Sequence, residues 1–246
     1  MDLIDLVIKD NKMQEIIDLD TSIFLHLNGL YTAYLDPFMK LYSGKLIWAP
    51  LYASLVYLLW HNLGWRRVLY ALIGVALVIL LADQVTGHLI RPWVGRLRPA
   101  NPENPLAPLV HIVDGYRGGR HSFPSCHAAN TFGLAIYLHL LFRHRWLSTF
   151  IVIWALITCY SRIYLGVHYP GDLLVGALIG AASASAIYYT LKQLIAWEEK
   201  HCHITTNTSQ SVGNMNQSAT LQGWIVPIAV GLLTILWIAI YSFIVC

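Results

Sequence analysis

Residues 67–90 read RVLYALIGVALVILLADQVTGHLI, an apolar run whose charged side chains are Arg67 and Asp83. A helix needs about 20 mostly apolar residues to cross the hydrocarbon of a bilayer, so this run predicts a transmembrane helix. Further spans are predicted at 46–62, 125–142, 147–165, 171–195 and 223–245. The 246 residues are 57% hydrophobic and only 12% charged, which is typical of membrane proteins. We therefore expect an all-α integral membrane bundle of about six transmembrane helices.

The spans divide the chain into a core and flanking segments. Residues 1–45 alternate apolar and charged positions, and they predict an amphipathic region at the membrane interface. The alternative is a short or tilted extra transmembrane helix. We expect the functional core at 46–195, a flexible Ser/Thr/Asn-rich loop at 196–222 and an additional transmembrane helix at 223–246.

Charge and cysteine content exclude several classes of protein. The net charge is only +3 and the arginines gather in a few short segments, so no nucleic acid partner is expected. The four cysteines form no Cys-x-x-Cys pair and indicate neither a disulfide framework nor a zinc site. The adjacent residues His201, Cys202 and His203 cannot easily converge on one ion. We expect no metal and no cofactor.

Small and aromatic residues support the predicted spans. Gly176, Gly180 and Ala184 stand four residues apart and predict a close approach between two helices. Tryptophans favour the headgroup level, and six of them fall near predicted span ends: Trp48, Trp60, Trp65, Trp93, Trp146 and Trp224.

Three polar clusters also lie at span ends. They are RPWVGRLRP at 91–99, PSCH at 124–127 and SRIYLGVHYPGD at 161–172. Successive spans cross the membrane in opposite directions, so the end of the second span, the start of the third and the junction of the fourth and fifth share one membrane face. The clusters are therefore predicted to meet in one site.

The arginines of this site indicate a bound anion. Cations at a membrane border are costly unless they are paired or serve a pathway, a partner or an anion. The planar fork of arginine can hold two phosphate oxygens, which makes Arg91, Arg98 and Arg162 candidate ligands. Ser125 stands at an N-cap position, where free N–H groups of the third span would face the anion. Each feature alone is more commonly a topology signal or a helix cap. Their combination on one face favours a phosphate site.

Two histidines and an aspartate complete the groups needed for phosphate ester hydrolysis. His168 is the predicted nucleophile. Asp172, four residues later in a helix that Pro170 can begin, is predicted to orient the His168 ring and to stabilise its positive charge. His127, beside the anion-binding turn, is the predicted general acid.

In this order the clusters resemble the signature of the type 2 phosphatidic acid phosphatase superfamily, K-x6-R-P, then P-S-G-H, then S-R-x5-H-x3-D. The third part is complete, the second differs at one position, and the resemblance covers roughly residues 46–195. It implies a helical bundle and a metal-independent mechanism through a phosphohistidine. It also implies that phosphate is bound by seven matching positions: Arg91, Arg98, Ser125, Cys126, His127, Ser161 and Arg162.

Two positions depart from that signature. Arg91 stands in place of lysine, and it keeps the charge with a larger, forked group. Cys126 stands in place of glycine, and it adds a side chain where backbone N–H groups should approach phosphate closely. A cysteine-nucleophile phosphatase is an alternative, but its loop requires an arginine six residues after the cysteine. That position is Phe132.

Other polar residues suggest weaker hypotheses. A zinc site of His121, His127 and His168 would make activity sensitive to chelators, although no HExxH-like spacing supports it. Asp83 within the second span is predicted to pair with a polar group of the bundle. In the long loop, Arg117, Arg120 and His121 are candidates for contact with a substrate headgroup.

Membrane side and location suggest the substrate. The loops opposite the clusters carry basic residues, which predicts that they are cytoplasmic and that the site faces the periplasm of a bacterial inner membrane. A site at the membrane border favours a lipid phosphate, with its chains among membrane lipids. Lipid A, phosphorylated at position 1 or 4′, is our first expectation because of the basic loop, with undecaprenyl diphosphate or phosphatidylglycerol phosphate as alternatives. A lipid-phosphate binder or transporter is the non-enzymatic alternative, although binding alone would not require the histidines.

Overall fold

The fold is taken from a computed structural model that describes residues 3–201 and 223–246. These residues form helices joined by short turns and one long polar loop, which confirms the expected all-α bundle. Most of the loop expected at 196–222 lies outside the described residues, as do Cys202 and His203 of the His-Cys-His sequence.

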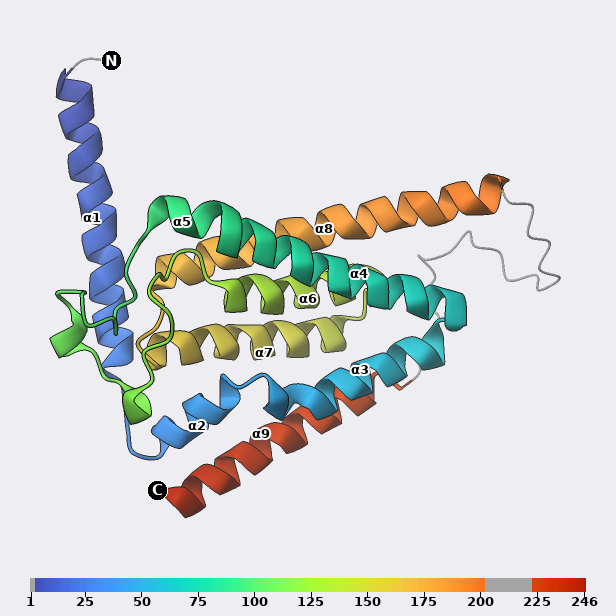
Figure 1. The fold of residues 1–246 in the computed structure, drawn as a ribbon. Coiled ribbons are helices and arrows are strands. Elements are labelled where there is room, and N and C mark those ends of the chain that lie inside the picture. Colours follow the sequence, from blue (N-terminus) through green and yellow to red (C-terminus); the bar gives the residue numbers. More distant parts are fainter. Residues whose placement is uncertain (1–2, 202–222) are drawn as a thin grey trace.

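Eight helices of eight or more residues are found in the described part of the chain (Figure 1). They are α1 (Leu3–Asn28), α2 (Leu35–Tyr42), α3 (Ala49–Asn62), α4 (Trp65–Asp83), α6 (Cys126–Phe142), α7 (Arg145–Tyr164), α8 (Pro170–His201) and α9 (Ile225–Val245). Shorter helical segments are η1 (Leu46–Trp48), η2 (Gln84–Ile90), α5 (Arg91–Val94), η3 (Ala107–Leu109) and η4 (Val113–Gly115). α8 therefore continues six residues beyond its expected end at 195.

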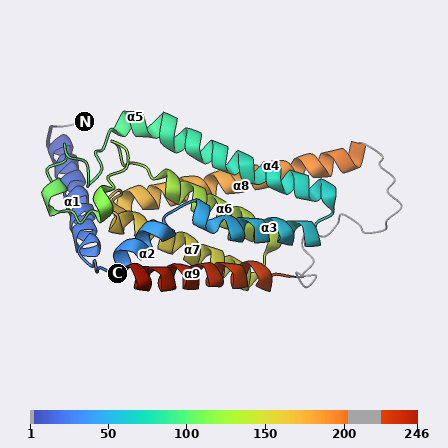
Figure 2. The same ribbon diagram turned by 60° about the horizontal axis from the view of Figure 1, so that its bottom comes forward.

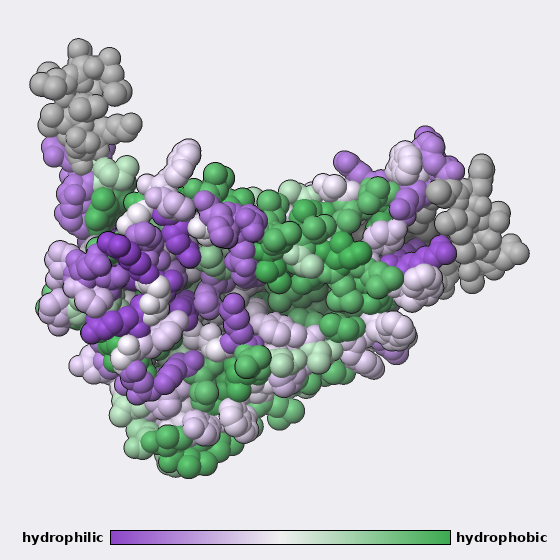
Figure 3. All heavy atoms as spheres, viewed as in Figure 1, coloured by the Kyte–Doolittle hydropathy of each residue, from purple (hydrophilic) through white to green (hydrophobic). Residues whose placement is uncertain are grey.

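Four helical stretches are long and apolar enough to cross a membrane: Trp65–Val94, Arg145–Tyr164, Pro170–Glu198 and Ile225–Val245. The first joins α4, η2 and α5 into one rod. α6 is apolar but has only 17 residues, and the 14 residues of α3 are preceded by η1. The chain is thus an integral membrane protein. Figure 3 shows apolar side chains over the middle of the bundle and hydrophilic ones gathered at the end near α1.

The centre of the bundle is α6, which packs most closely against α8. A Cβ atom added at Gly180 would lie 2.0 Å from the carbonyl oxygen of Ala129, and one at Gly176 would lie 2.4 Å from that of Ser125. Ala184, the next small residue of this face, is fully buried. These contacts confirm the predicted close approach, and they fix the first turns of α8 against the start of α6.

The surroundings of Asp83 and Trp48 can be compared with what the sequence predicted for them. Asn130 donates from Nδ2 to Asp83 Oδ1 at 3.0 Å, which confirms that Asp83 pairs with a polar group of the bundle. The interfacial interpretation of Trp48 is wrong. Its ring is 2% exposed, meets Trp154 edge-on and donates from Nε1 to the Tyr42 carbonyl at 2.8 Å. Trp60, by contrast, is 66% exposed.

α1 lies across the hydrophilic end of the bundle instead of running along it (Figures 1 and 2). Its second half is anchored. Phe24 is fully buried, and Asn28 donates from Nδ2 to the carbonyls of Ile163 (3.1 Å) and Tyr164 (2.9 Å) at the end of α7. Nearer the middle of α1, the apolar side chains of Met13, Ile16 and Leu19 are exposed. That α1 lies in the membrane interface stays a prediction.

Candidate active site

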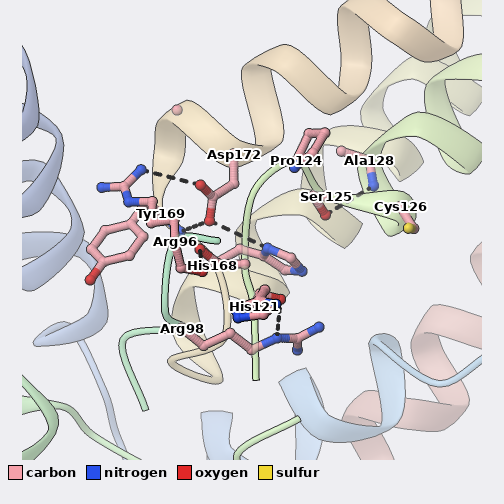
Figure 4. Close-up of polar contacts among 12 residues, drawn as sticks. Arg96, Arg98, His121, Pro124, Ser125, Cys126, Ala128, His168, Tyr169 and Asp172 are labelled. Carbon is pink, nitrogen blue, oxygen red and sulfur yellow. Dashed lines mark hydrogen bonds and ion pairs between the residues drawn. The ribbon is translucent and has the colours of Figure 1, made fainter. Parts of the chain in front are cut away.

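The three predicted clusters meet at the hydrophilic end of the bundle. The first begins with α5 and continues into the long loop, the second begins α6, and the third connects α7 to α8. In Figure 4 the side chains of His168, Asp172 and Arg98 and the start of α6 lie around one small region. The structure thus agrees with the topological argument that placed them on one membrane face.

The turn from α7 to α8 presents His168. Gly166 adopts φ +71°, a conformation that favours glycine, and a Cβ there would lie 2.6 Å from a methyl group of Val110. The turn buries His168, which is 1% exposed, and Asp172, which is fully buried. His168 Nδ1 lies 3.4 Å from Asp172 Oδ2, which leaves Nε2 as the ring nitrogen free to react.

Burial sets the protonation state of this histidine. Burial, together with the cations Arg98, Arg162 and Arg91, lowers the pKa of His168 well below its ordinary value near 6.5. His168 is therefore neutral at pH 7, which is the state that a nucleophile requires. The Asp172 carboxylate is fixed from another side by the Tyr169 N–H, which donates to Oδ2 at 2.9 Å.

Ser125 caps α6 as predicted. Its backbone is extended (φ −81°, ψ 114°), and its Oγ accepts a hydrogen bond from the Ala128 N–H at 3.4 Å. Its own N–H donates to the Asp172 carbonyl at 3.0 Å, so the starts of α6 and α8 are tied together. The N–H groups of Cys126 and His127 come next in α6, where a helix has no internal acceptors for them. They are the backbone donors available to a phosphate.

Arg98 is held over the site by the long loop. Its Nε donates to the His121 carbonyl at 3.0 Å, and Gly118 passes so close that a Cβ there would lie 2.1 Å from Arg98 Nη1. Burial and the positive charges of Arg162 and Arg91 lower the pKa of Arg98 to about 10. An anion bound here would relieve that repulsion.

Arg162 is buried, 3% exposed, at the end of α7. It donates from Nη1 to the Ser43 hydroxyl and from Nη2 to the Tyr116 hydroxyl at 3.1 Å. The hydroxyl of neighbouring Ser161 donates to the Thr158 carbonyl at 2.6 Å within α7. The predicted role of Ser161 in phosphate binding stays a prediction.

The two departures from the signature touch each other. Arg91 Nη2 donates to Cys126 Sγ at 3.0 Å and to the Pro124 carbonyl at 2.8 Å. The Thr86 hydroxyl lies 3.1 Å from the same sulfur. Thr86 belongs to η2, a wide helical turn of the π type, and such turns are frequent at functional sites. Arg91 is thus held against α6 by the side chain that replaces glycine.

Sequence reasoning missed four residues at this site. Ser43 and Tyr116 hold Arg162, and Arg96 and Asp20 lie beside Asp172. Burial raises the pKa of Tyr116, but Arg162, Arg98 and Lys45 outweigh it, so the net shift is downward. Arg96 could have been noticed as a third arginine within RPWVGRLRP. The others stand in segments without a motif, and only the fold brings them here.

The loop arginines predicted to meet a headgroup are engaged within the loop. Arg117 Nη1 donates to the Ala100 carbonyl at 2.6 Å, and Arg120 forms an exposed ion pair of 2.8 Å with Glu103. His121 lies at the site, and its backbone pairs with Leu97.

The positions of the possible metal ligands decide whether the zinc site considered above can form. Among the described side chains, those of residues 11–198, 200–201 and 223–246, no group of three or more His, Cys, Asp or Glu is arranged to hold a metal ion. His121, His127 and His168 therefore do not form the zinc site considered above.

Known proteins are similar to this chain in sequence and fold. The family model described as PAP2 superfamily matches residues 67–196. A lipid A 4′-phosphatase from Bacteroides thetaiotaomicron is 47% identical over 92% of this chain and 96% of its own length. Another from Porphyromonas gingivalis is 30% identical over 72% of this chain and 74% of its own. The crystal structure of Aquifex aeolicus LpxE, 24% identical, is similar in fold with a TM-score of 0.52, covering 69% of this chain and 94% of that one.

Proposed function

The chain belongs to the PAP2 superfamily, and we propose that it removes the 4′-phosphate of lipid A through a phosphohistidine formed on His168. It is a phosphoric ester hydrolase of the membrane lipid phosphatase type. Its substrate is thus a lipid phosphate.

One observation carries the proposed chemistry. A buried, neutral histidine lies among three arginines. Among the side chains that the structure describes, those of residues 11–198, 200–201 and 223–246, no ion pair compensates Arg91, Arg98 or Arg162 with a carboxylate. Uncompensated cations in a buried region call for an anion. A phosphate ester supplies that anion, and it brings its phosphorus to the nucleophile.

The reaction proceeds in two steps. Nε2 of His168 attacks phosphorus, the P–O bond to the sugar breaks, and His127 gives its proton to the leaving oxygen. Asp172 stabilises the positive charge on the His168 ring, while the arginines and the first N–H groups of α6 stabilise the transferred phosphoryl group. Water then attacks the phosphohistidine, His127 accepts the proton of that water, and inorganic phosphate leaves with His168 restored.

Support for lipid A comes from the relatives, and support for a lipid substrate comes from the surface beside Arg91. Both relatives described above carry the name lipid A 4′-phosphatase, and one is nearly half identical. Next to Arg91, Trp93 is 86% exposed and Val94 50% exposed, which offers an apolar surface to acyl chains of a substrate at the membrane border. The loop arginines that suggested lipid A in the sequence do not add to this support.

We place the protein in a bacterial inner membrane with the site on the periplasmic side. At the opposite end of the bundle, basic side chains stand in the α6–α7 turn and in the adjoining parts of α4, α7 and α8: Arg66, Arg67, Arg143, Arg145, Lys192 and Lys200. Positive residues favour the cytoplasmic side of a membrane. The hydrophilic end then faces the periplasm.

A phosphate-release assay tests the proposal. Purified protein in detergent and chelator is given lipid A, undecaprenyl diphosphate or phosphatidylglycerol phosphate, and mass spectrometry locates the lost phosphate. We expect release from the 4′ position of lipid A, none with His168→Ala, and normal release with His139→Ala, a control at an exposed histidine of α6.

Faster release from undecaprenyl diphosphate would favour that substrate. Turnover by His168→Ala, or activity restored only by zinc, would contradict the mechanism, and no release from any lipid would favour a binder.

A further inference from the structure

Arg96 lies on the side of the Asp172 carboxylate that faces away from His168 (Figure 4). Its Nη1 donates to Asp172 Oδ1 at 3.2 Å and to Asp20 Oδ2 at 2.7 Å. Its guanidinium carbon stands 3.6 Å from the centre of the Tyr169 ring, a cation–π contact. Arg96 is therefore held on three sides.

The charge of Arg96 is already compensated, unlike that of the other arginines at the site. Two carboxylates accept hydrogen bonds from it, whereas Arg91, Arg98 and Arg162 donate to carbonyl, thiol or hydroxyl groups. The positive charge of an arginine paired with two carboxylates is already neutralised, so the arginine attracts a phosphate only weakly. Arg96 is suited to hold Asp172 instead.

The Asp172 carboxylate divides its oxygens between two partners. Oδ2 faces His168, and Oδ1 faces Arg96. Asp172 is fully buried, and a buried carboxylate without a cation is unfavourable. A neutral carboxyl group could not stabilise positive charge on His168, so the contact with Arg96 maintains the charged form that the reaction uses.

Asp20 brings α1 into this arrangement. While its Oδ2 holds Arg96, its Oδ1 accepts a hydrogen bond from the Gly171 N–H at 2.7 Å, in the first turn of α8. The side chain of Asp20 is only 13% exposed. α1 cannot shift easily, because Phe24 and Asn28 anchor its second half. Asp20 lies well before residue 67, where the match to the family begins.

We propose that Asp20 and Arg96 are positioning residues, through which α1 fixes the Asp172 carboxylate and thereby the ring of His168. This inference rests on the proposed function, because it assigns the pair a task in His168 chemistry. Neither residue touches the phosphate. Their loss should therefore lower kcat while KM changes little.

Kinetics of the full-length protein in detergent test this role, with lipid phosphate as substrate across pH 4.5–8.5. We expect Asp20→Asn, which is nearly isosteric, and Arg96→Gln to lower kcat about 10- to 100-fold, the loss typical of one hydrogen bond to a charged group. KM should stay within about threefold. Asp20→Glu should recover part of the activity.

The matched control is Asp18→Asn, the same change at an exposed residue of α1 that bonds only Gln14 in the described contacts. It should behave as wild type. Asp20→Asn with kcat within about twofold of wild type, or a loss of kcat of which Asp20→Glu recovers nothing, would overturn the positioning role. Turnover by His168→Ala would instead overturn the proposed function, so the two failures are separable.

Discussion

The contact between Arg91 and Cys126 joins two side chains that each depart from the signature. Because the guanidinium donates to the sulfur at 3.0 Å, a change at either residue alters the surroundings of the other. Lysine at 91 has no planar fork to bridge the sulfur and the Pro124 carbonyl. Glycine at 126 would leave the guanidinium without one of its partners.

A double-mutant cycle measures this coupling. We expect Arg91→Lys and Cys126→Gly each to lower kcat/KM, and the double variant to lose less than the two losses combined. Contacting residues commonly show coupling of about 0.5–3 kcal/mol. The test cycle combines Arg91→Lys with Cys126→Gly. The control cycle combines Arg91→Lys with Cys246→Ser, a change at an exposed cysteine of the chain. Additive losses in both cycles would mean that the departures are independent.

The buried, neutral state of His168 also has a consequence for stability. The folded protein keeps this ring uncharged below pH 6.5, since burial lowers the pKa of His168, whereas the unfolded chain binds a proton there. The contribution of His168 is thus fully present above about pH 6.5 and declines as the pH falls, by up to about 1.4 kcal/mol per pH unit.

Thermal unfolding in phosphate-free detergent buffer at pH 7.5 and 5.0 checks this effect. Wild type should lose more of its free energy of unfolding on acidification than His168→Asn does. Comparing the two proteins cancels the titration of the other histidines. The same loss in both would show that His168 does not titrate as its burial requires.

Individual site residues could be predicted where a motif fixes their spacing. His168 and Asp172 stand four apart across the start of a helix, so local geometry alone brings them together. Ser43, Tyr116 and Asp20 come from three separate segments, and no local pattern marks them. Their placement depends on how α1, α2 and the long loop pack on the bundle. No spacing between residues in the sequence indicates that packing.

At the scale of elements, the pairing of α6 with α8 positions the site. Apolar runs predicted these helices, and the small residues of α8 predicted their closeness. The π-type turn η2 and the crosswise direction of α1 could not be predicted, because neither leaves a periodic signal in an apolar or mixed segment. Both place residues at the site, Thr86 in the first case and Asp20 in the second.

Gly180 should be intolerant of even one added carbon. Gly180→Ala would put a Cβ against the backbone of Ala129, and overpacking of this kind costs about 1–3 kcal/mol. We expect a lower melting temperature in detergent and lower activity, since α6 carries His127 and is capped by Ser125. The control is Gly64→Ala, where an added Cβ meets nothing within 4 Å. Equal stability of the two variants would contradict the close packing.

At the scale of the whole molecule, the end of α9 lies at the same end of the bundle as the site (Figures 1 and 2). The hydroxyl of Tyr34, just before α2, donates to the Ala239 carbonyl at 3.3 Å, which fixes α9 beside α2. The side of the membrane on which the chain ends therefore reports on the side of the active site.

Reporter fusions test that side. Alkaline phosphatase, which is active only in the periplasm, should be active when fused after Cys246 and inactive when fused after Arg143, at the opposite end of the bundle. A green fluorescent protein at the same two positions should give the reverse result. Activity of the phosphatase reporter at Arg143 alone would place the site in the cytoplasm.

The shortness of α6 determines how the enzyme meets its substrate. At a rise of about 1.5 Å per residue, its 17 residues span about 26 Å, a few Å less than the hydrocarbon core of about 30 Å. The proposed catalytic groups at its start would then lie near the boundary of acyl chains and headgroups, and we expect the lipid substrate to arrive by lateral diffusion. The rate of turnover then depends on the mole fraction of lipid phosphate in the membrane. Dilution with inert phospholipid should slow the reaction even when the bulk concentration of lipid phosphate is unchanged.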